Sequence, residues 1–445
     1  MILLKVILAM LVLFYTFASL LRFRVIERRV PASLIICNLL FLLFYCLGFC
    51  YQAFNSISHG RFMLAAVGFY YSESGVIAIS FILFQYILAI EIINAVTVLV
   101  FRNRTRPAEA FPFSVPVWGF VLVAGWSALT VGTLLFRIVT TVGIPYFIAH
   151  NILRSVFFEG LGIVVELLFV AVFMACVLWM IAAKQRWRWF VLFVVTGFIT
   201  LTRWPLVLMI LAFLCFLFYV KRRRFLQVKY LFPGVTIIIA AVSVAILTRP
   251  SADTWEGPLQ VIYGTEQAPQ MPALLIARDS MALKTSLSTR PFGFVGEMIP
   301  RQFKAPFGIS EAITGNQAFT KTHWTSRLKN DQSEMSFGGL NELYFRGGFP
   351  LILAIMMLLP LAYGTITSQV RNANTLFIVE TALCWFVFQL LRSDMAHTFS
   401  RIPSLALGSF VAIVIVNAGY RAAQQRARRA RERAAMAAQA AALAA

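Results

Sequence analysis

Charged residues are scarce in this sequence, because only 13% of its 445 residues are Asp, Glu, Lys or Arg. A soluble domain carries nearer a quarter, so the chain lacks the polar surface that a soluble globule needs. Hydrophobic residues make up 60% of the chain, and many lie in runs near the roughly 20 residues that one membrane-crossing helix requires. Because these runs are continuous and not alternating, membrane-spanning strands are disfavoured. The sequence therefore predicts an all-α, polytopic membrane protein.

Motifs for nucleotides and metals are missing as well. There is no P-loop and no Rossmann glycine fingerprint, and the histidines show no HExxH spacing. The histidines are His59, His150, His323 and His397. All six cysteines lie within apolar runs, which indicates packing and not a disulfide framework or a zinc site. We therefore expect no cofactor and no metal, and nothing supports a nucleotide-driven reaction.

The net charge of +21 comes from short basic clusters between the apolar runs. The clusters lie at 22–29, 102–106, 184–188, 221–224 and 421–433. Such clusters mark the cytoplasmic side of a membrane, where they meet anionic headgroups. All of them fall on one side if about eleven helices cross the membrane, with the N-terminus outside and the C-terminus cytoplasmic. This distribution explains the charge without nucleic acid.

The expected organisation follows from the same count. The expected helices are about 2–21, 31–53, 75–100, 111–136, 160–183, 189–202, 204–220, 229–248, 349–366, 375–391 and 403–420. Residues 1–248 then hold helices 1–8, 249–345 form one large outer loop before helix 9, 346–420 hold helices 9–11, and 421–445 form a basic, alanine-rich tail. Within the outer loop, the apolar face of 271–288 predicts an amphipathic helix on the membrane surface.

The stretch 189–220 is too long for one ordinary span, and it has basic clusters at both ends. If the stretch crosses the membrane twice, both basic clusters stay on the cytoplasmic side. Each of the two helical arms is then shorter than the hydrocarbon thickness. The turn between the arms should therefore lie below the outer membrane surface, and Arg203 sits at that turn. An arginine at such depth needs protein, water or an anion around it.

Several arginines are expected at the outer ends of the helices, although the positive-inside rule favours arginine on the cytoplasmic side. They are Arg203, Arg301, Arg346, Arg392 and Arg401. Guanidinium groups are permanently charged and fork to phosphate oxygens, so the set predicts binding of a lipid-linked phosphate or diphosphate. The alternative is structural: these arginines reach toward headgroups or pair with Glu342 and Asp394.

Glu342 and Arg346 share one helix face if the ninth helix begins near Gly339. Either they form a simple intrahelical pair, or Arg346 contacts a phosphate and Glu342 a sugar hydroxyl. Further candidates are His397, on the same short loop as Asp394 and Arg401, and His323 in the large loop. Three carboxylates within expected spans are functional or else paired inside the bundle: Glu91, Glu166 and Glu380.

Three stretches together resemble a known family. They are "TLTRWPLVLMILAFLCFLFYVKRRR", "GEMIPRQFKAPFG" with "SFGGLNELYFRGGFPLIL", and "LLRSDMAHTFSRIPSLALGSFVAIVI". The family is the bacterial Wzy-type polymerases of oligosaccharide repeat units, which include the O-antigen and enterobacterial common antigen polymerases. The first stretch is similar to a segment of that family in which a turn with an arginine is followed by an apolar helix. The others are similar to that family's late outer loop and closing Arg-acid…Phe…Arg segment, and helix order agrees along most of the chain.

The resemblance implies a multi-pass enzyme of the bacterial inner membrane whose site faces the periplasm. Such enzymes are glycosyltransferases that polymerise undecaprenyl-diphosphate-linked repeat units into O-antigen, capsule or exopolysaccharide. The partners implied are the lipid-linked donor and acceptor, membrane lipids, and a chain-length regulator and flippase. Fixed arginines would stabilise the charge that grows on the leaving diphosphate. Glu342 is the candidate base for the acceptor hydroxyl, with Arg203 as the second catalytic candidate.

Other functions stay open at this point. An O-antigen ligase, which moves finished polymer onto a lipid core, would rely on a histidine in the large outer loop, where His323 is the only one. A flippase or transporter of lipid-linked sugars would place charge through the bundle midplane and often show a repeat. In this sequence, the charged residues outside the cytoplasmic clusters are concentrated at the outer ends of the expected helices, and there is no internal repeat. An assembly component of an export machine is a further alternative.

Overall fold

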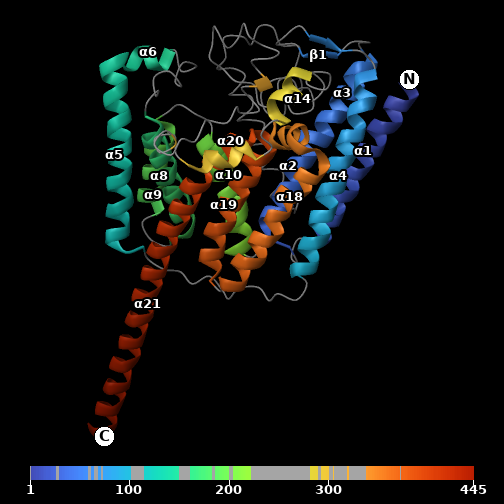
Figure 1. Ribbon diagram of the computed structural model, residues 1–445. Helices are drawn as coiled ribbons and strands as arrows, with labels where there is room; N and C mark the ends of the chain where they lie inside the picture. Colours follow the sequence, from blue (N-terminus) through green and yellow to red (C-terminus); the bar gives the residue numbers. More distant parts are fainter. Residues whose placement is uncertain are drawn as a thin grey trace. The chain divides into compact units, whose positions relative to one another are not determined.

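The protein is described by a computed structural model (Figure 1). It describes residues 2–26, 30–58, 62–64, 69–71, 74–101, 115–149, 161–182, 186–199, 204–221, 281–288, 292–299, 304, 318–319, 337–370 and 372–444. The expected eighth helix at 229–248 lies outside these residues, as do most of the large loop, Arg203, Arg301 and three of the histidines: His59, His150 and His323.

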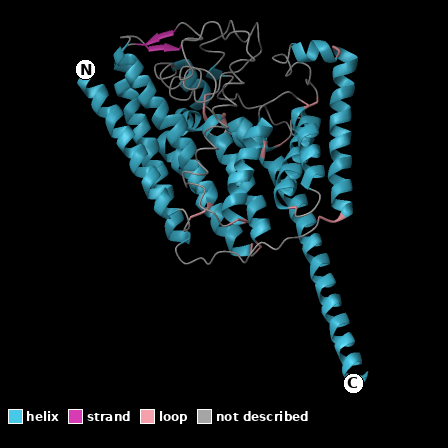
Figure 2. Cartoon of the chain, turned by 180° about the vertical axis from the view of Figure 1, so that it is seen from behind, coloured by secondary structure: helices cyan, strands magenta, loops and turns pink. Residues whose placement is uncertain are grey.

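The described residues are helical apart from one short hairpin (Figure 2). The first part holds α1 (Ile2–Ile26), α2 (Ala32–Phe41), a π-helix η1 (Leu42–Cys46), α3 (Leu47–Ser58), β1 (Phe62–Leu64), β2 (Phe69–Tyr71) and α4 (Ser74–Phe101). Next come α5 (Val117–Thr141), α6 (Ile144–Ala149), α8 (Gly162–Ile181), α9 (Arg186–Phe198) and α10 (Trp204–Tyr219). The last part holds α14 (Met281–Ser288), a 3₁₀ turn η5 (Gly293–Met298), α18 (Gly339–Gln369), α19 (Ala373–Arg392), α20 (Met395–Ser400) and α21 (Ile402–Ala444).

Eight helical segments of the described residues are long and apolar enough to cross a membrane. They are Ile2–Val25, Ala32–Phe54, Ile77–Leu99, Val117–Thr141, Gly162–Ile181, Gly339–Thr365, Ala373–Arg392 and Met395–Ala437. The predicted all-helical fold is thereby confirmed for the membrane-length segments, and their number suits a multi-pass membrane protein. The two arms expected in 189–220 correspond to α9 and α10, which are separate and short: α9 has 13 residues and α10 has 16.

Two local differences from the sequence prediction have simple causes. The fourth expected helix begins at Val117 and not at 111, because Pro116 precedes it with φ −63° and ψ 146°, an extended conformation that the helix cannot include. The stretch between the expected helices 31–53 and 75–100 contains the antiparallel hairpin of β1 and β2, in which Phe62 pairs with Tyr71. Its strands are rich in aromatic residues, which favour strands.

The chain forms two compact units, and each is described by itself. Unit 1 comprises Met1–Arg106, Arg223–Gln369 and Leu383–Pro403, and unit 2 comprises Pro107–Arg222, Val370–Ala382 and Ser404–Ala445. In unit 1, α1, α3 and α4 lie side by side, and α4 also packs against α18 (Figure 1). In unit 2, α8 packs against α5, α9 and α10.

Polar pairs join the helices of unit 1. The side-chain amides of Asn38 and Asn94 donate to each other's carbonyl oxygens, with N···O distances of 2.8 Å and 2.9 Å. Near them, Glu91 accepts hydrogen bonds from both terminal nitrogens of Arg22 and, at 2.7 Å, from the Tyr15 hydroxyl. Inside a membrane, such side-chain bonds between helices stabilise packing because hydrocarbon offers polar groups no partner.

The Asn38–Asn94 pair should show its contribution in a double-mutant cycle. Each single change to alanine leaves one buried amide without its partner, and the double change removes both. We expect a coupling energy of about 0.6–1.7 kcal/mol, the range for hydrogen bonds between membrane helices. The measurement is the free energy of unfolding in detergent. Strict additivity of the two single changes would contradict the pairing.

Candidate functional site

The site begins with a break in α18. Gly347 and Gly348 leave helical geometry inside this helix, and Gly348 has φ +66° and ψ −162°, a conformation that is essentially restricted to glycine. Pro350, two residues after Gly348, lies in the first turn of the second piece, where its missing N–H breaks no helical hydrogen bond. The break leaves a short first piece, Gly339–Arg346, which carries both Glu342 and Arg346 one turn apart.

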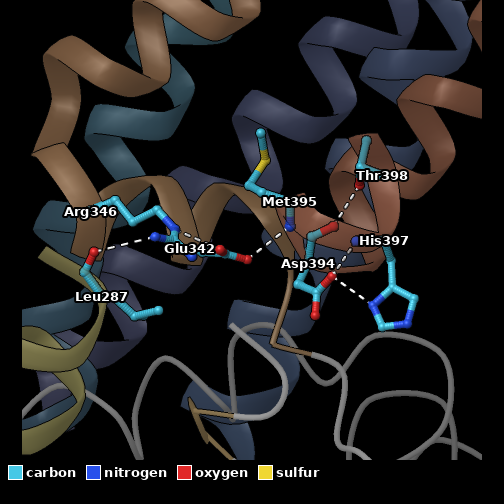
Figure 3. A network of polar contacts seen from close by, with 7 residues as sticks. All are labelled: Leu287, Glu342, Arg346, Asp394, Met395, His397 and Thr398. Carbon is cyan, nitrogen blue, oxygen red and sulfur yellow. Dashed lines mark hydrogen bonds and ion pairs between the residues drawn. The ribbon is translucent and has the colours of Figure 1, made fainter. Parts of the chain in front are cut away.

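Glu342 and Arg346 form a buried ion pair. The Nε of Arg346 donates to Oε1 of Glu342 at 2.6 Å, and their side chains are only 3% and 0% exposed. The second carboxylate oxygen of Glu342 accepts the backbone N–H of Met395 at 2.8 Å. Arg346 also points Nη1 at the carbonyl of Leu287, 3.4 Å away (Figure 3). The pair therefore connects α18 to α14 and to the start of α20.

Aromatic rings complete the surroundings of this pair. The guanidinium carbon of Arg346 lies 5.8 Å from the ring centroid of Phe294 in η5. The same Phe294 ring meets Phe399 of α20 edge-on, with centroids 4.8 Å apart. Such cation–π and edge-to-face contacts add to the ion pair in fixing the position of α20.

Asp394 begins α20 as its N-cap. Its Oδ1 accepts the backbone N–H of His397 at 2.8 Å and also lies 2.8 Å from Nδ1 of the His397 ring. The Asp394 side chain is fully buried, whereas the His397 side chain is 51% exposed. Figure 3 shows the imidazole turned away from the Glu342–Arg346 pair, with Asp394 between them.

Two predicted arginines flank α20 along the chain. Arg392 ends α19 and Arg401 follows α20, and both are half-buried. The guanidinium carbon of Arg392 lies 5.8 Å from the Phe388 ring centroid. Arg392 and Arg401 thus flank α20 along the chain, and Arg346 is linked to the first residue of α20 through Glu342.

Residues that sequence reasoning missed hold this arrangement in place. The Tyr45 hydroxyl, from the π-helix η1, donates to the carbonyl of Leu391 at 3.1 Å, next to Arg392. The Tyr86 hydroxyl of α4 donates to Asn341 of α18 at 3.1 Å. A π-helix turn often marks a functional region, but a buried tyrosine in an apolar run gives no sequence signal that it bonds a residue hundreds of positions away.

The structure thus brings Glu342, Arg346, Asp394 and His397 into one region, with Arg392 and Arg401 beside it. The other intramembrane carboxylates lie elsewhere. Glu91 pairs with Arg22, Glu166 accepts the Ser404 hydroxyl at 2.6 Å within unit 2, and Glu380 is a buried residue of α19 in unit 2. Arg203, Arg301 and His323 fall outside the described residues, so their predicted roles stay predictions.

The intrahelical pair expected as one reading of Glu342 and Arg346 is present. Among the described residues, no group of three or more His, Cys, Asp or Glu is arranged to hold a metal ion. Comparisons of this chain with family models, with curated proteins and with solved structures found no match.

Proposed function

We propose that this protein polymerises oligosaccharide repeat units carried on undecaprenyl diphosphate, at the periplasmic face of a bacterial inner membrane. The proposal rests on Arg392 and Arg401, which flank α20, and on the His397–Asp394 pair at that helix, in a helical chain suited to a membrane. Permanently charged guanidinium groups suit a diphosphate. A histidine and carboxylates suit proton transfer from a sugar hydroxyl.

Glycan transfer from a lipid diphosphate needs few catalytic groups beyond arginines, a histidine and a carboxylate. The anomeric carbon of the donor glycan is bonded to a lipid diphosphate, which is already a good leaving group. Arginines placed near the diphosphate stabilise the charge that grows as that bond breaks. Arg392 and Arg401 are the better exposed of the three described arginines, since Arg346 is held by Glu342 in the interior. We assign diphosphate binding to Arg392 and Arg401, and to Arg203 and Arg301 as predicted from the sequence.

Changing Arg401 to alanine tests this assignment. Removing one preorganised donor to the developing charge should lower the polymerisation rate about 10²–10³-fold. Arg401→Lys should restore little, because an ammonium group cannot fork to two phosphate oxygens. The measurement is the chain-length profile of surface glycan in a strain that carries only the variant gene. Arg426→Ala, on the exposed part of α21, is the matched control and should leave the profile unchanged. A normal chain-length profile in Arg401→Ala would contradict the assignment of Arg401 to diphosphate binding.

Deleting the gene separates the proposed function from its alternatives. Single repeat units attached to their acceptor indicate a polymerase. Lipid-linked polymer that is never transferred indicates a ligase. Lipid-linked repeat units trapped at the cytoplasmic face indicate a flippase.

One observation favours the transporter as a second candidate. The break in α18 at Gly347–Gly348 falls inside a segment long and apolar enough to span the membrane. Transporters often use such discontinuous helices, with exposed half-helix ends at the substrate. In this chain, however, the end of the first piece carries the buried Arg346–Glu342 pair, which fixes one arrangement of the neighbouring elements. We therefore rank polymerisation first.

A further inference from the structure

His397 and Asp394 have the geometry of an oriented histidine base. A carboxylate can only accept, so Nδ1 of His397 carries the proton in the 2.8 Å contact with Asp394. The lone pair of the neutral ring then lies on Nε2, on the side turned from Asp394 (Figure 3). The carboxylate is fully buried and the imidazole is half exposed. The buried carboxylate therefore fixes both the tautomer of the ring and the direction in which Nε2 points.

Glu342 has the opposite geometry. Its side chain is 0% exposed, one oxygen is held by Arg346 and the other by the N–H of Met395. A general base must come within hydrogen-bond reach of the proton that it removes. An acceptor sugar would reach Glu342 only after both of these bonds broke and α20 moved. Its contacts instead suit a residue that holds α20 in position.

The helix that presents His397 is fixed from several sides. Glu342 holds its first residue, Met395, by a hydrogen bond. Phe399, one turn further, packs against Phe294 at 4.8 Å and against Phe386 at 6.1 Å between ring centroids. A general base is effective when packing and contacts from neighbouring residues hold its side chain in one position. These contacts make α20 a rigid support for the imidazole.

We propose that His397 is the general base of glycan transfer, that Asp394 orients it, and that Glu342 positions α20 beneath it. This inference rests on the proposed function. In the step, a hydroxyl oxygen of the acceptor sugar bonds to the anomeric carbon of the donor, and the hydroxyl proton passes to Nε2 of His397. The bond from that carbon to the diphosphate oxygen breaks, and its electron pair leaves with the undecaprenyl diphosphate. The imidazolium then gives its proton to water.

Chemical rescue of His397→Ala tests the base. We expect membrane vesicles of the strain, supplied with its own lipid-linked repeat units, to polymerise about 10²–10⁴-fold more slowly with this variant. Added imidazole should restore part of the rate, because the half-exposed position admits it. Arg426→Ala, on the exposed part of α21, is again the control and should keep the full rate. A His397→Ala protein that folds, as judged by its level in the membrane and its elution in detergent, but gains nothing from imidazole overturns the proposal.

Asp394→Asn separates two roles of Asp394, which are to orient the His397 ring and to cap α20. Asparagine is as good an N-cap as aspartate, so α20 should keep its start. The amide lacks the charge that stabilises the imidazolium, and its NH₂ group can donate to Nδ1 and so favour the wrong tautomer. We expect a loss of at least about 10-fold in rate with unchanged stability, by analogy with the magnitude for acid–base groups. A full rate in Asp394→Asn would mean that the contact only caps the helix, and would overturn the role of Asp394.

The gene deletion keeps the two proposals apart. Unchanged polymer in the deletion strain would remove the proposed function itself. Polymer that is lost on deletion but normal in His397→Ala would remove only the inference about the base.

Discussion

Arg346→Ala is expected to cost about 3–5 kcal/mol of unfolding free energy, the range for removing one partner of a buried ion pair. The change leaves the Glu342 carboxylate in the interior with only the N–H of Met395 as a described hydrogen-bond donor. It also removes the contacts of the guanidinium with Leu287 and with the Phe294 ring. We expect the variant to lose its compact fold in detergent at a denaturant concentration that the wild type withstands.

A double change shows whether the charge or the contact causes the loss. In Glu342→Gln with Arg346→Met, neither member of the pair carries a charge, and the glutamine oxygen can still accept the Met395 N–H. Because apolar or neutral replacements of a whole buried pair are often tolerated, we expect this variant to recover most of the lost stability. A cost below about 1 kcal/mol for Arg346→Ala alone would contradict the buried pair as a source of stability.

The same two variants separate a structural role of Arg346 from binding of a phosphate. If Arg346 only supports α20, then the stable double variant should polymerise at a rate near that of the wild type. If Arg346 also binds the diphosphate, the double variant should fold and still be inactive. The rate of glycan polymerisation in vesicles, compared with unfolding in detergent, distinguishes the two.

The helical membrane fold was readable from the sequence because it depends on local properties. Long apolar runs force helices in lipid, and the i,i+4 spacing of Glu342 and Arg346 alone predicts their contact. Pro116 shows the limit at a boundary, because α5 begins after this proline, several residues later than the start that the apolar stretch predicts. The glycine pair permits the break in α18, but the break itself depends on torsion angles that the surroundings impose.

The site itself was predictable only in part. The sequence placed His397 beside Asp394 and Arg401 on one loop, because all three are close along the chain. It could not show that Glu342 bonds the N–H of Met395, since those residues are 53 positions apart and a backbone donor leaves no trace in the sequence. Nor could it tell which carboxylate is buried and which side chain is exposed. These properties are set by how α18, α19 and α20 pack, and packing is not local.

Gly339→Ala should produce the second large effect, because α18 begins in close contact with the end of α19. A Cβ placed on Gly339 would lie 2.3 Å from the carbonyl oxygen of Leu390 and 3.3 Å from the sulfur of Met395. The obstructing oxygen belongs to the backbone, so no side-chain rotation relieves it. Either α18 or the end of α19 must shift. Overpacking of this kind costs about 1–3 kcal/mol or more.

The shift should matter more for activity than for folding. The end of α19 carries Arg392 and leads into Asp394 and α20, and the start of α18 carries Glu342. A displacement of about 1 Å in supporting structure can cost about 10²-fold in rate. Gly125→Ala on α5 is the matched control, because nothing lies within 4 Å of its added Cβ. It should be neutral, or stabilising by up to about 1 kcal/mol through helix propensity. If the two variants proved equally stable and equally active, the close packing of α18 on α19 could not be what positions the site.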